Sequence, residues 1–498
     1  MPRPQSRRRF LASFAAAAGA LALSGRSGVQ SAHSAPTDGE PRYLITLGMF
    51  GGASIIDSFL PIAESESANA GTLNCFPDAN VIQPPGSNLR AVDWSGNHFG
   101  DAYQSQLSAF LAKYKDDMLV ATQTGTSVNH TVAQKRAMTG NGALSGRTLQ
   151  EAVAAAYGAD CPLPNVNMSS NGYAQHGDDL SLPNWAYMEP VAVPLLWPFA
   201  LHGSRGIKIT DGQTIVDGPS PELVQLARGV RNDHLDPESA FYQTFQFSEK
   251  LGRWRTQRDE IQPKLEQADL ITKLNVLTEA MGLPLGDYDL ASSPDAAAVA
   301  AAFLRLDHDP LHAQAALAYL LIKHDVAVAI TLGPNFSLTL GEGNEALILN
   351  PPLSFDNSHT DHRDTQAFMW QRMLEVADGL ITLLKAAETA PGSGISKWER
   401  SMIYCATDFG RTKNRPSFSN GFGSGHDLNN GILAISPMLK GNQVLGGVDP
   451  DTALTYGFDP QTGAPDPNRE MFEHEIYAGL TQALGIDTGL PDVSAMVS

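Results

Sequence analysis

Carboxylate and imidazole side chains alternate over one short loop of this chain. Residues 356–362 read Asp-Asn-Ser-His-Thr-Asp-His. Oxygen and nitrogen ligands of these types bind a divalent metal ion when they converge within about 2 Å of it. The loop therefore predicts a metal site, with Asp356, His359 and His362 as candidate ligands. A solvated turn whose acids cap the following helix is the alternative interpretation.

A second polar cluster follows a predicted strand and precedes a predicted helix. It contains Thr126, Asn129 and His130. A hydroxyl at a helix N-terminus lies at the positive end of the helix dipole, where an anion or an ionised alkoxide is favoured. The alternative is an ordinary helix cap, in which Asn129 or Thr131 binds the free backbone amides.

Two further clusters lie nearer the C-terminus. Asp408 ends a predicted strand, where a carboxylate can bind metal or position a base, and Arg411 can hold an anionic substrate through two hydrogen bonds. A buried Asp408–Arg411 pair that fixes the loop is the alternative. His426 lies in a glycine-rich loop. Alone it would be an ordinary loop histidine, and with the other clusters it would complete a shared metal site.

The elements that must position these clusters alternate between strands and helices. Apolar and β-branched runs predict buried strands at 42–49, 118–123, 326–332, 401–407 and 431–435. Apolar residues spaced three and four apart predict helices at 104–114, 148–157, 310–323 and 365–388. This alternation predicts an α/β fold, a three-layer α/β/α sandwich with a mainly parallel central sheet. Ligands bind such sheets at the carboxyl ends of the strands, which is where the clusters fall.

The chain is predicted to consist of an export signal and one large domain. Arg7 and Arg8 precede a modestly apolar run that lacks acids, which predicts a twin-arginine signal peptide over 1–35 and a periplasmic or secreted bacterial protein. The run is shorter than the ~20 residues of a membrane-spanning helix, so no transmembrane segment is expected after signal removal. The domain at 36–498 contains a predicted helical insertion near 236–281.

Composition narrows the classes of partner and activity. The net charge of -19 argues against nucleic acid as a partner, because no basic stripe exists to neutralise phosphates. No nucleophile elbow, P-loop or dinucleotide fingerprint occurs, which disfavours serine esterases, P-loop nucleotidases and Rossmann oxidoreductases. The 3 cysteines allow at most one disulfide, and Cys405 is predicted to be a core residue.

Taken in order, these clusters resemble the alkaline phosphatase and sulfatase superfamily, and within it a family of twin-arginine-exported bacterial proteins. Three stretches carry the likeness together with the 356–362 loop. They are Gly-Gly-Ala-Ser-Ile-Ile-Asp-Ser-Phe at 51–59, Asp-Phe-Gly-Arg-Thr at 408–412 and Gly-His-Asp at 425–427. The likeness spans most of the chain after the predicted signal.

The resemblance implies roles for the candidate residues. Thr126, followed by Asn129 and His130, looks like the threonine nucleophile element of phosphodiesterase relatives. By the same likeness, Asp356 with His359 or His362 would form one metal pair. Asp408 would be a ligand at a second metal site, and His426 would be the late histidine of the set.

The chain also departs from the superfamily pattern. Residues 47–51 offer no carboxylate after the first predicted strand, Phe409 stands where a histidine is often found, and His426 precedes Asp427 where the usual order is Asp-His. These departures predict one divalent metal ion instead of a complete pair.

Two functions from different classes follow. The first is a metal-dependent hydrolase of a small-molecule or polymeric phosphate or sulfate ester. In it Thr126 attacks in line, and the metal and Arg411 stabilise charge on the equatorial oxygens. The second is a superfamily scaffold without catalysis that acts as an exported binding or assembly protein with a protein partner.

Overall fold

The computed structural model describes most of the chain after the predicted signal. The described residues are 40–95, 105–169, 175–198, 208–210, 214–216, 221–230, 234, 236–245, 247, 270–278, 285, 291–307, 309–334, 338–340, 347–349 and 354–498. The signal predicted at 1–35 lies outside them, as does much of the insertion predicted near 236–281. The described parts of that insertion contain three short helices, α7 (Asp236–Glu238), α8 (Ala240–Phe245) and α10 (Leu270–Leu274).

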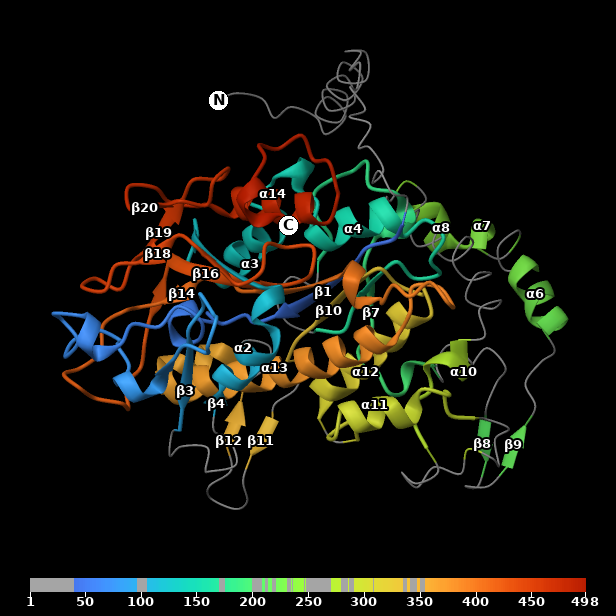
Figure 1. The fold of residues 1–498 in the computed structure, drawn as a ribbon. Coiled ribbons are helices and arrows are strands. Elements are labelled where there is room, and N and C mark those ends of the chain that lie inside the picture. Colours follow the sequence, from blue (N-terminus) through green and yellow to red (C-terminus); the bar gives the residue numbers. More distant parts are fainter. Residues whose placement is uncertain are drawn as a thin grey trace, which may run out of the picture. The chain divides into compact units, whose positions relative to one another are not determined.

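An eight-stranded sheet forms the centre of the domain (Figure 1). Its strands, from one edge to the other, are β17 (Gln443–Leu445), β5 (Met118–Thr124), β16 (Asn429–Ile435), β13 (Ser401–Ala406), β1 (Tyr43–Gly48), β10 (Ala329–Leu332), β6 (Asn165–Asn167) and β7 (Glu189–Pro190). β16 is antiparallel to both of its neighbours, and the other pairings are parallel. The sheet is therefore mixed and mostly parallel, and the predicted α/β class is confirmed.

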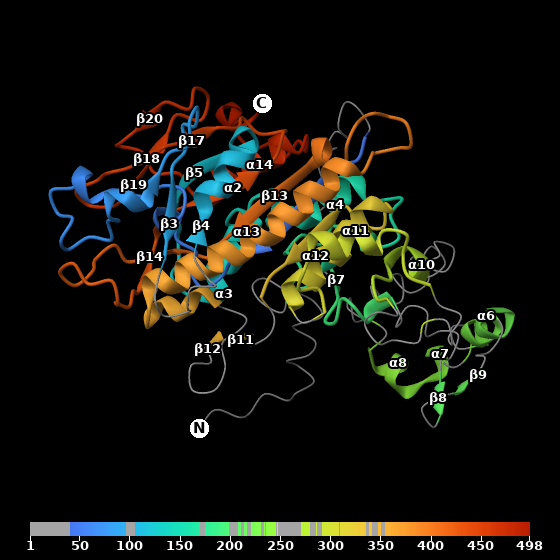
Figure 2. The same ribbon diagram turned by 60° about the horizontal axis from the view of Figure 1, so that its bottom comes forward.

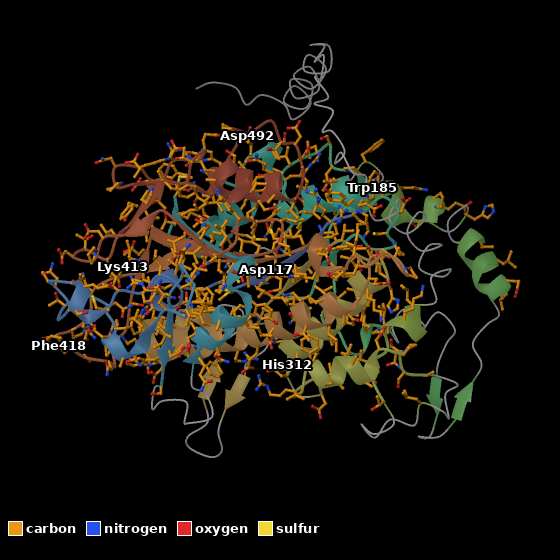
Figure 3. The ribbon with its side chains drawn as sticks, in the orientation of Figure 1. Asp117, Trp185, His312, Lys413, Phe418 and Asp492 are labelled. Carbon is orange, nitrogen blue, oxygen red and sulfur yellow. The ribbon has the colours of Figure 1, made fainter. Side chains whose placement is uncertain are left out.

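The central strands are buried on both faces. Every residue of β1, β13 and β16 is buried, which is the pattern of a mostly parallel sheet covered by helices on each side. Cys405 lies in β13 as a buried core residue, and all three cysteines are free and buried. Side chains fill the space between the sheet and its helices (Figure 3).

Helices cover both faces of the sheet (Figure 1). One group consists of α3 (His130–Thr139), α4 (Leu149–Tyr157) and α14 (Glu473–Ala483). The other consists of α2 (Leu107–Tyr114), α11 (Ala296–Ala302), α12 (Pro310–Lys323) and α13 (His362–Ala386). α12 and α13 pack side by side, as both ribbon views show (Figure 2). None of the helices in the described part of the chain is long and apolar enough to cross a membrane.

Smaller elements complete the described chain. Among them η13 (Ser354–His359), directly before α13, and the two-stranded ribbon of β14 (Gly410–Arg411) and β15 (His426–Asp427) are the ones that carry candidate site residues. The remaining strands and helix are β2 (Val81–Ile82), β3 (Ala91–Trp94), β4 (Ser105–Gln106), β8 (Lys208–Thr210), β9 (Thr214–Val216), β11 (Leu338–Leu340), β12 (Leu347–Leu349), β18 (Gly447–Val448), β19 (Thr455–Phe458), β20 (Pro465–Asp466) and α6 (Pro221–Val230).

The strand directions bring the candidate clusters to one edge of the sheet. β5, β13 and β1 run in the same direction, so their carboxyl ends lie at a common edge. β16 runs the opposite way and therefore begins at that edge, directly after His426 in β15. This arrangement explains how His130 after β5, Asp408 after β13 and His426 before β16 come together.

Candidate metal centre

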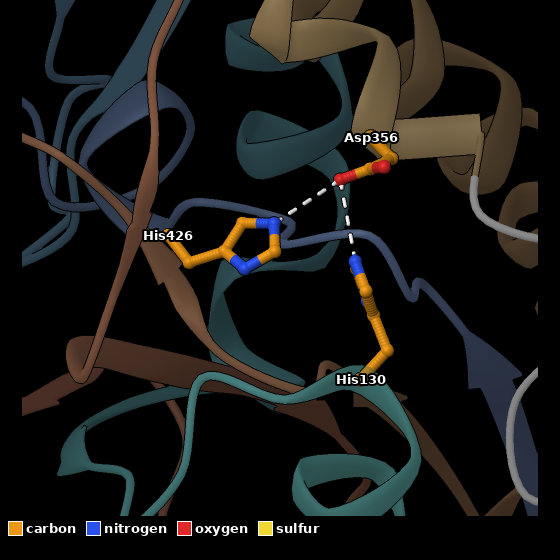
Figure 4. Close-up of side chains that lie close together, drawn as sticks. All are labelled: His130, Asp356 and His426. Atoms are coloured by element: carbon orange, nitrogen blue, oxygen red, sulfur yellow. Dashed lines mark ion pairs between the residues drawn. The ribbon is translucent and has the colours of Figure 1, made fainter.

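Three side chains converge at this edge with the composition of a metal site. The Nε2 atom of His130 lies 3.5 Å from Oδ1 of Asp356, and Nε2 of His426 lies 3.4 Å from the same oxygen. One ligand atom from each residue lies within 4.8 Å of the other two. Figure 4 shows both imidazoles directed at this one carboxylate oxygen. The three residues could thus hold a metal ion.

Two of the three distances between the donor atoms, those to Asp356, match the edge of a tetrahedral site. Nitrogen and oxygen ligands ~2.0–2.1 Å from a tetrahedral zinc lie ~3.3–3.4 Å from one another. The two distances to Asp356 Oδ1 are close to this edge length. Two imidazoles and one carboxylate favour a first-row transition metal over calcium or magnesium, which prefer oxygen ligands throughout.

His130 is held by the start of α3 and by a buried carboxylate. The preceding Asn129 caps the helix through its side chain, which accepts from the backbone of Val132 at 3.3 Å. Nδ1 of His130 donates to Oδ2 of Asp408 at 2.8 Å. In the neutral imidazole this hydrogen bond keeps the proton on Nδ1 and leaves the Nε2 lone pair facing Asp356, which is the tautomer that binds metal. Asn129 therefore acts as a helix cap, and Asp408 acts as the partner that orients His130.

Asp408 is fixed in turn by the glycine turn after β1. Its side chain is fully buried and accepts from the backbone amides of Gly51 at 3.1 Å and Gly52 at 2.9 Å. Burial disfavours a protonated His130, yet the neighbouring Asp356 and Asp408 carboxylates outweigh it and raise the pKa of His130 to about 9.

His426 is oriented in a similar way by a backbone acceptor. Its Nδ1 donates to the carbonyl of Val128 at 2.9 Å, which leaves the Nε2 lone pair for a metal. The ring of Phe409 stacks on His426 with centroids 4.1 Å apart, and its centroid lies 4.8 Å from that of His130. Phe409 therefore packs against both candidate metal-binding imidazoles.

Asp356 is held by Arg411. Nη2 of Arg411 donates to Asp356 Oδ1 at 2.7 Å, and the guanidinium also binds the carbonyls of Phe355, Ser424 and Gly51. Burial opposes ionisation of Asp356, but His130 and Arg411 hold the pKa of its carboxyl well below the usual range. Arg411 is itself fully buried. In this structure it contacts a candidate metal ligand, and its predicted contact with substrate stays a prediction.

His359 and His362, which the sequence left as alternatives, lie in different surroundings. Nε2 of His359 lies 3.2 Å from Asp356 Oδ1 and 2.9 Å from His426 Nε2, so His359 borders the three-residue group as a potential fourth donor. His362 is fully buried, with Nε2 3.0 Å from Oδ2 of Asp57 and Nδ1 2.7 Å from the Ser424 hydroxyl. His362 thus belongs to a separate buried network beneath the loop.

Thr126, the predicted nucleophile, contacts a glutamate and an arginine. Its hydroxyl lies 2.8 Å from Oε1 of Glu473 and 2.9 Å from Nη1 of Arg136. Sequence reasoning missed Glu473, because it is 347 residues away from Thr126 and no motif marks it. It also missed Asp57, although this residue lies inside the 51–59 stretch that carries the resemblance.

Comparison of the chain with protein-family models, with curated proteins and with solved structures finds no match. The geometry of the site therefore carries the functional argument.

Proposed function

We propose that this chain is an exported, metal-dependent hydrolase of phosphate or sulfate esters. The observation that supports it most is the convergence of His130, Asp356 and His426, with each imidazole presenting Nε2 inward because its Nδ1 is bound elsewhere. A hydrogen-bonded outer nitrogen is the usual support of a metal-binding histidine. The proposal retains the resemblance to the alkaline phosphatase and sulfatase superfamily and the periplasmic or secreted location.

The charge of the site favours an anionic substrate. A divalent ion held by His130, Asp356 and His426 would supply Lewis-acid polarisation of an ester oxygen and charge stabilisation in the transition state. Two neutral imidazoles and one carboxylate would cancel only half of its double positive charge, and Arg411, which is bound to Asp356, adds a positive charge that balances the second carboxylate, Asp408. Phosphate and sulfate esters carry the negative charge that such a site attracts.

His359 favours a second candidate function, the exported binding or assembly protein. Structural zinc sites have four protein ligands, whereas catalytic sites keep one position open. The Nε2 atom of His359 lies near Asp356 and His426, and a shift of this side chain toward His130 would make it the fourth ligand. The exposure of His359 points the other way and favours the hydrolase. Its side chain is 45% exposed, more than those of the other three residues, as expected for a histidine at the mouth of a site with an open position.

The test combines metal analysis with an ester assay. Full-length protein exported through its own signal should contain about one equivalent of a transition metal and should hydrolyse an aryl phosphate or an aryl sulfate. Because His130 and His426 supply two of the three ligands, His130→Ala and His426→Ala should lose both metal and turnover. His474→Ala, which removes an exposed histidine on α14, is the matched control. Wild-type protein without metal, or with metal but without turnover of any ester, would contradict the hydrolase.

His359→Ala separates the two candidate functions. In a hydrolase with an open position the variant keeps its metal, since three ligands remain. In a closed structural site the variant loses metal and unfolds at a lower temperature, and the wild type shows no turnover.

A further inference from the structure

The hydroxyl of Thr126 lies between a carboxylate and a guanidinium. Arg136 donates through Nη1 to Oγ1 of Thr126 at 2.9 Å, so the proton of this hydroxyl is free to point elsewhere. Oε1 of Glu473 accepts it at 2.8 Å. A hydroxyl that accepts from a cation and donates to a carboxylate has the partners of an activated nucleophile.

Backbone contacts hold the three groups in this arrangement. Oε1 of Glu473 also accepts from the backbone amide of Thr126 at 2.8 Å, and Arg136 donates to the Thr126 carbonyl at 2.7 Å. Glu473 is only 4% exposed, and its Oε2 finds no hydrogen-bond partner among the described residues. A buried carboxylate oxygen without a donor is costly, and it keeps a lone pair available for a proton.

We propose that Glu473 takes the proton of Thr126 when this hydroxyl attacks the ester, and that Arg136 stabilises the alkoxide that forms. This inference rests on the proposed hydrolase function. Thr126 lies four residues before His130, a stretch of chain that spans at most ~14 Å. Between them, the carbonyl of Val128 holds His426. The segment 126–130 therefore joins the hydroxyl to two of the three candidate metal ligands.

The reaction balances over two half-reactions. In the first, Oγ1 of Thr126 forms a bond to the phosphorus or sulfur atom and its proton passes to Glu473. The bond to the leaving oxygen breaks, and that oxygen keeps the electron pair and takes a proton from solvent. In the second, water attacks the phosphorus or sulfur atom and the bond to Oγ1 breaks. Glu473 returns its proton to Oγ1, and the proton from water passes to solvent.

A structural role for Glu473 makes different predictions. In that case the carboxylate only holds the segment after β5 against the start of α14, and activity requires no more than the two hydrogen bonds that it accepts from Thr126. Glu473→Gln separates the roles, because an amide oxygen still accepts both hydrogen bonds but does not take up the proton. Glu470→Gln, an exposed carboxylate three residues away, is the matched control.

The first measurement is steady-state hydrolysis of an aryl phosphate and an aryl sulfate as a function of pH. Glu473→Gln should lower kcat by about 10²–10⁴-fold. It should also remove the acid limb of the pH profile and leave KM and metal content unchanged. Thr126→Val should lose activity to a similar extent, and Thr126→Ser should retain it. If Glu473→Gln keeps the wild-type kcat and pH profile, the inference is wrong while the hydrolase proposal stands.

The second measurement does not depend on bound metal. Full-length protein, with and without a chelator, is treated with diisopropyl fluorophosphate, and the modified residue is located by mass spectrometry. Thr126 should be labelled at least ten times faster in the wild type than in Glu473→Gln. Equal rates, or no adduct at Thr126, would overturn the inference. An adduct at Thr126 in a protein that turns over no ester would instead contradict the proposed function.

Discussion

The buried carboxylate of Asp408 decides which nitrogen of His130 is available to a metal. It accepts hydrogen bonds from the backbone amides of Gly51 and Gly52 and from Nδ1 of His130. A hydrogen-bond donor in place of this carboxylate would move the imidazole proton of His130 from Nδ1 to Nε2. Asp408 is not one of the three candidate metal ligands, yet it controls whether His130 can bind metal.

Asp408→Asn is therefore expected to weaken metal binding. The amide can present an NH2 group to Nδ1 and so favour the tautomer with a proton on Nε2, which does not bind metal. We expect metal affinity to fall by about 10–100-fold. Titration against a competing chelator measures this, with Asp492→Asn, an exposed acid, as the control. An unchanged affinity would show that Asp408 does not set the tautomer.

His130 also predicts how the stability of the metal-free chain depends on pH. The pKa of its imidazole is raised to about 9 by Asp356 and Asp408, although burial opposes this. A raised pKa means that the protonated ring stabilises the folded state fully below the unfolded value of about 6.5, and that this stabilisation is lost as pH rises through about 9. In the presence of chelator, the melting temperatures of the wild type and His130→Gln should converge between these two values. A constant difference would contradict this prediction.

At the scale of elements, two loops cross at close range and carry the donors between them. Residues 356–362 contribute Asp356 and His359, and residues 422–426 contribute His426. The loops are joined by backbone hydrogen bonds from Ser424 to Ser358 at 2.8 Å and from His362 to Phe422 at 2.7 Å. At the crossing, a Cβ atom on Gly423 would lie 2.0 Å from the carbonyl oxygen of His359.

Gly423→Ala should separate the two loops. Overpacking of this kind costs about 1–3 kcal/mol of stability, and here it would also move the donors apart. We expect a lower melting temperature and weaker metal binding. Gly421→Ala is the matched control, because a Cβ there meets nothing within 4 Å. Equal behaviour of the two variants would argue against a tight crossing.

His362→Gln should destabilise the fold whether or not metal is bound. His362 and Asp57 form a fully buried pair. Burial by itself would raise the pKa of Asp57, but the charge of His362 and its hydrogen bond lower this pKa below its usual value. Breaking a buried pair by removing one partner costs about 3–5 kcal/mol. Urea unfolding of the metal-free protein measures this, with the exposed His359→Gln as the comparison. A loss below about 1 kcal/mol would contradict the large contribution predicted for this pair.

At the scale of the whole molecule, the site joins segments that are far apart in the chain. His130, Asp356 and His426 come from α3, η13 and β15, which are distributed over almost 300 residues of sequence. An ion bound by all three would therefore bridge three separate parts of the fold. Because such a site does not exist in the unfolded chain, metal binding stabilises the folded state.

Metal removal should lower the stability of the wild type and leave ligand variants unaffected. A ligand present at one hundred times its dissociation constant adds about 2.7 kcal/mol to the folded state. Chelation should reverse this gain in the wild type, and His426→Ala should not respond to chelator. Differential scanning calorimetry checks both. A chelator effect of the same size in His426→Ala would place the metal elsewhere.

Much of the fold could be predicted because its signals are local. The helix at 310–323 was bounded correctly, since Asp309 caps its first turn and Pro310 occupies its first position. The strand predicted at 118–123 is β5, one residue longer. Direction is not encoded in such runs, so the antiparallel course of β16 could not be read from its apolar residues.

The sequence by itself determined the α/β class and the edge of the sheet where the candidate ligands meet. Hydrophobic periodicity and the residues that follow each strand are properties of neighbouring positions. Only the tertiary structure decided that His359 borders the donors while His362 is buried with Asp57, and that the Thr126 hydroxyl donates a hydrogen bond to Glu473. These arrangements depend on contacts between segments that are distant in the chain. His359 and His362 are only three residues apart in one loop, and their spacing does not reveal which imidazole faces solvent and which faces the core.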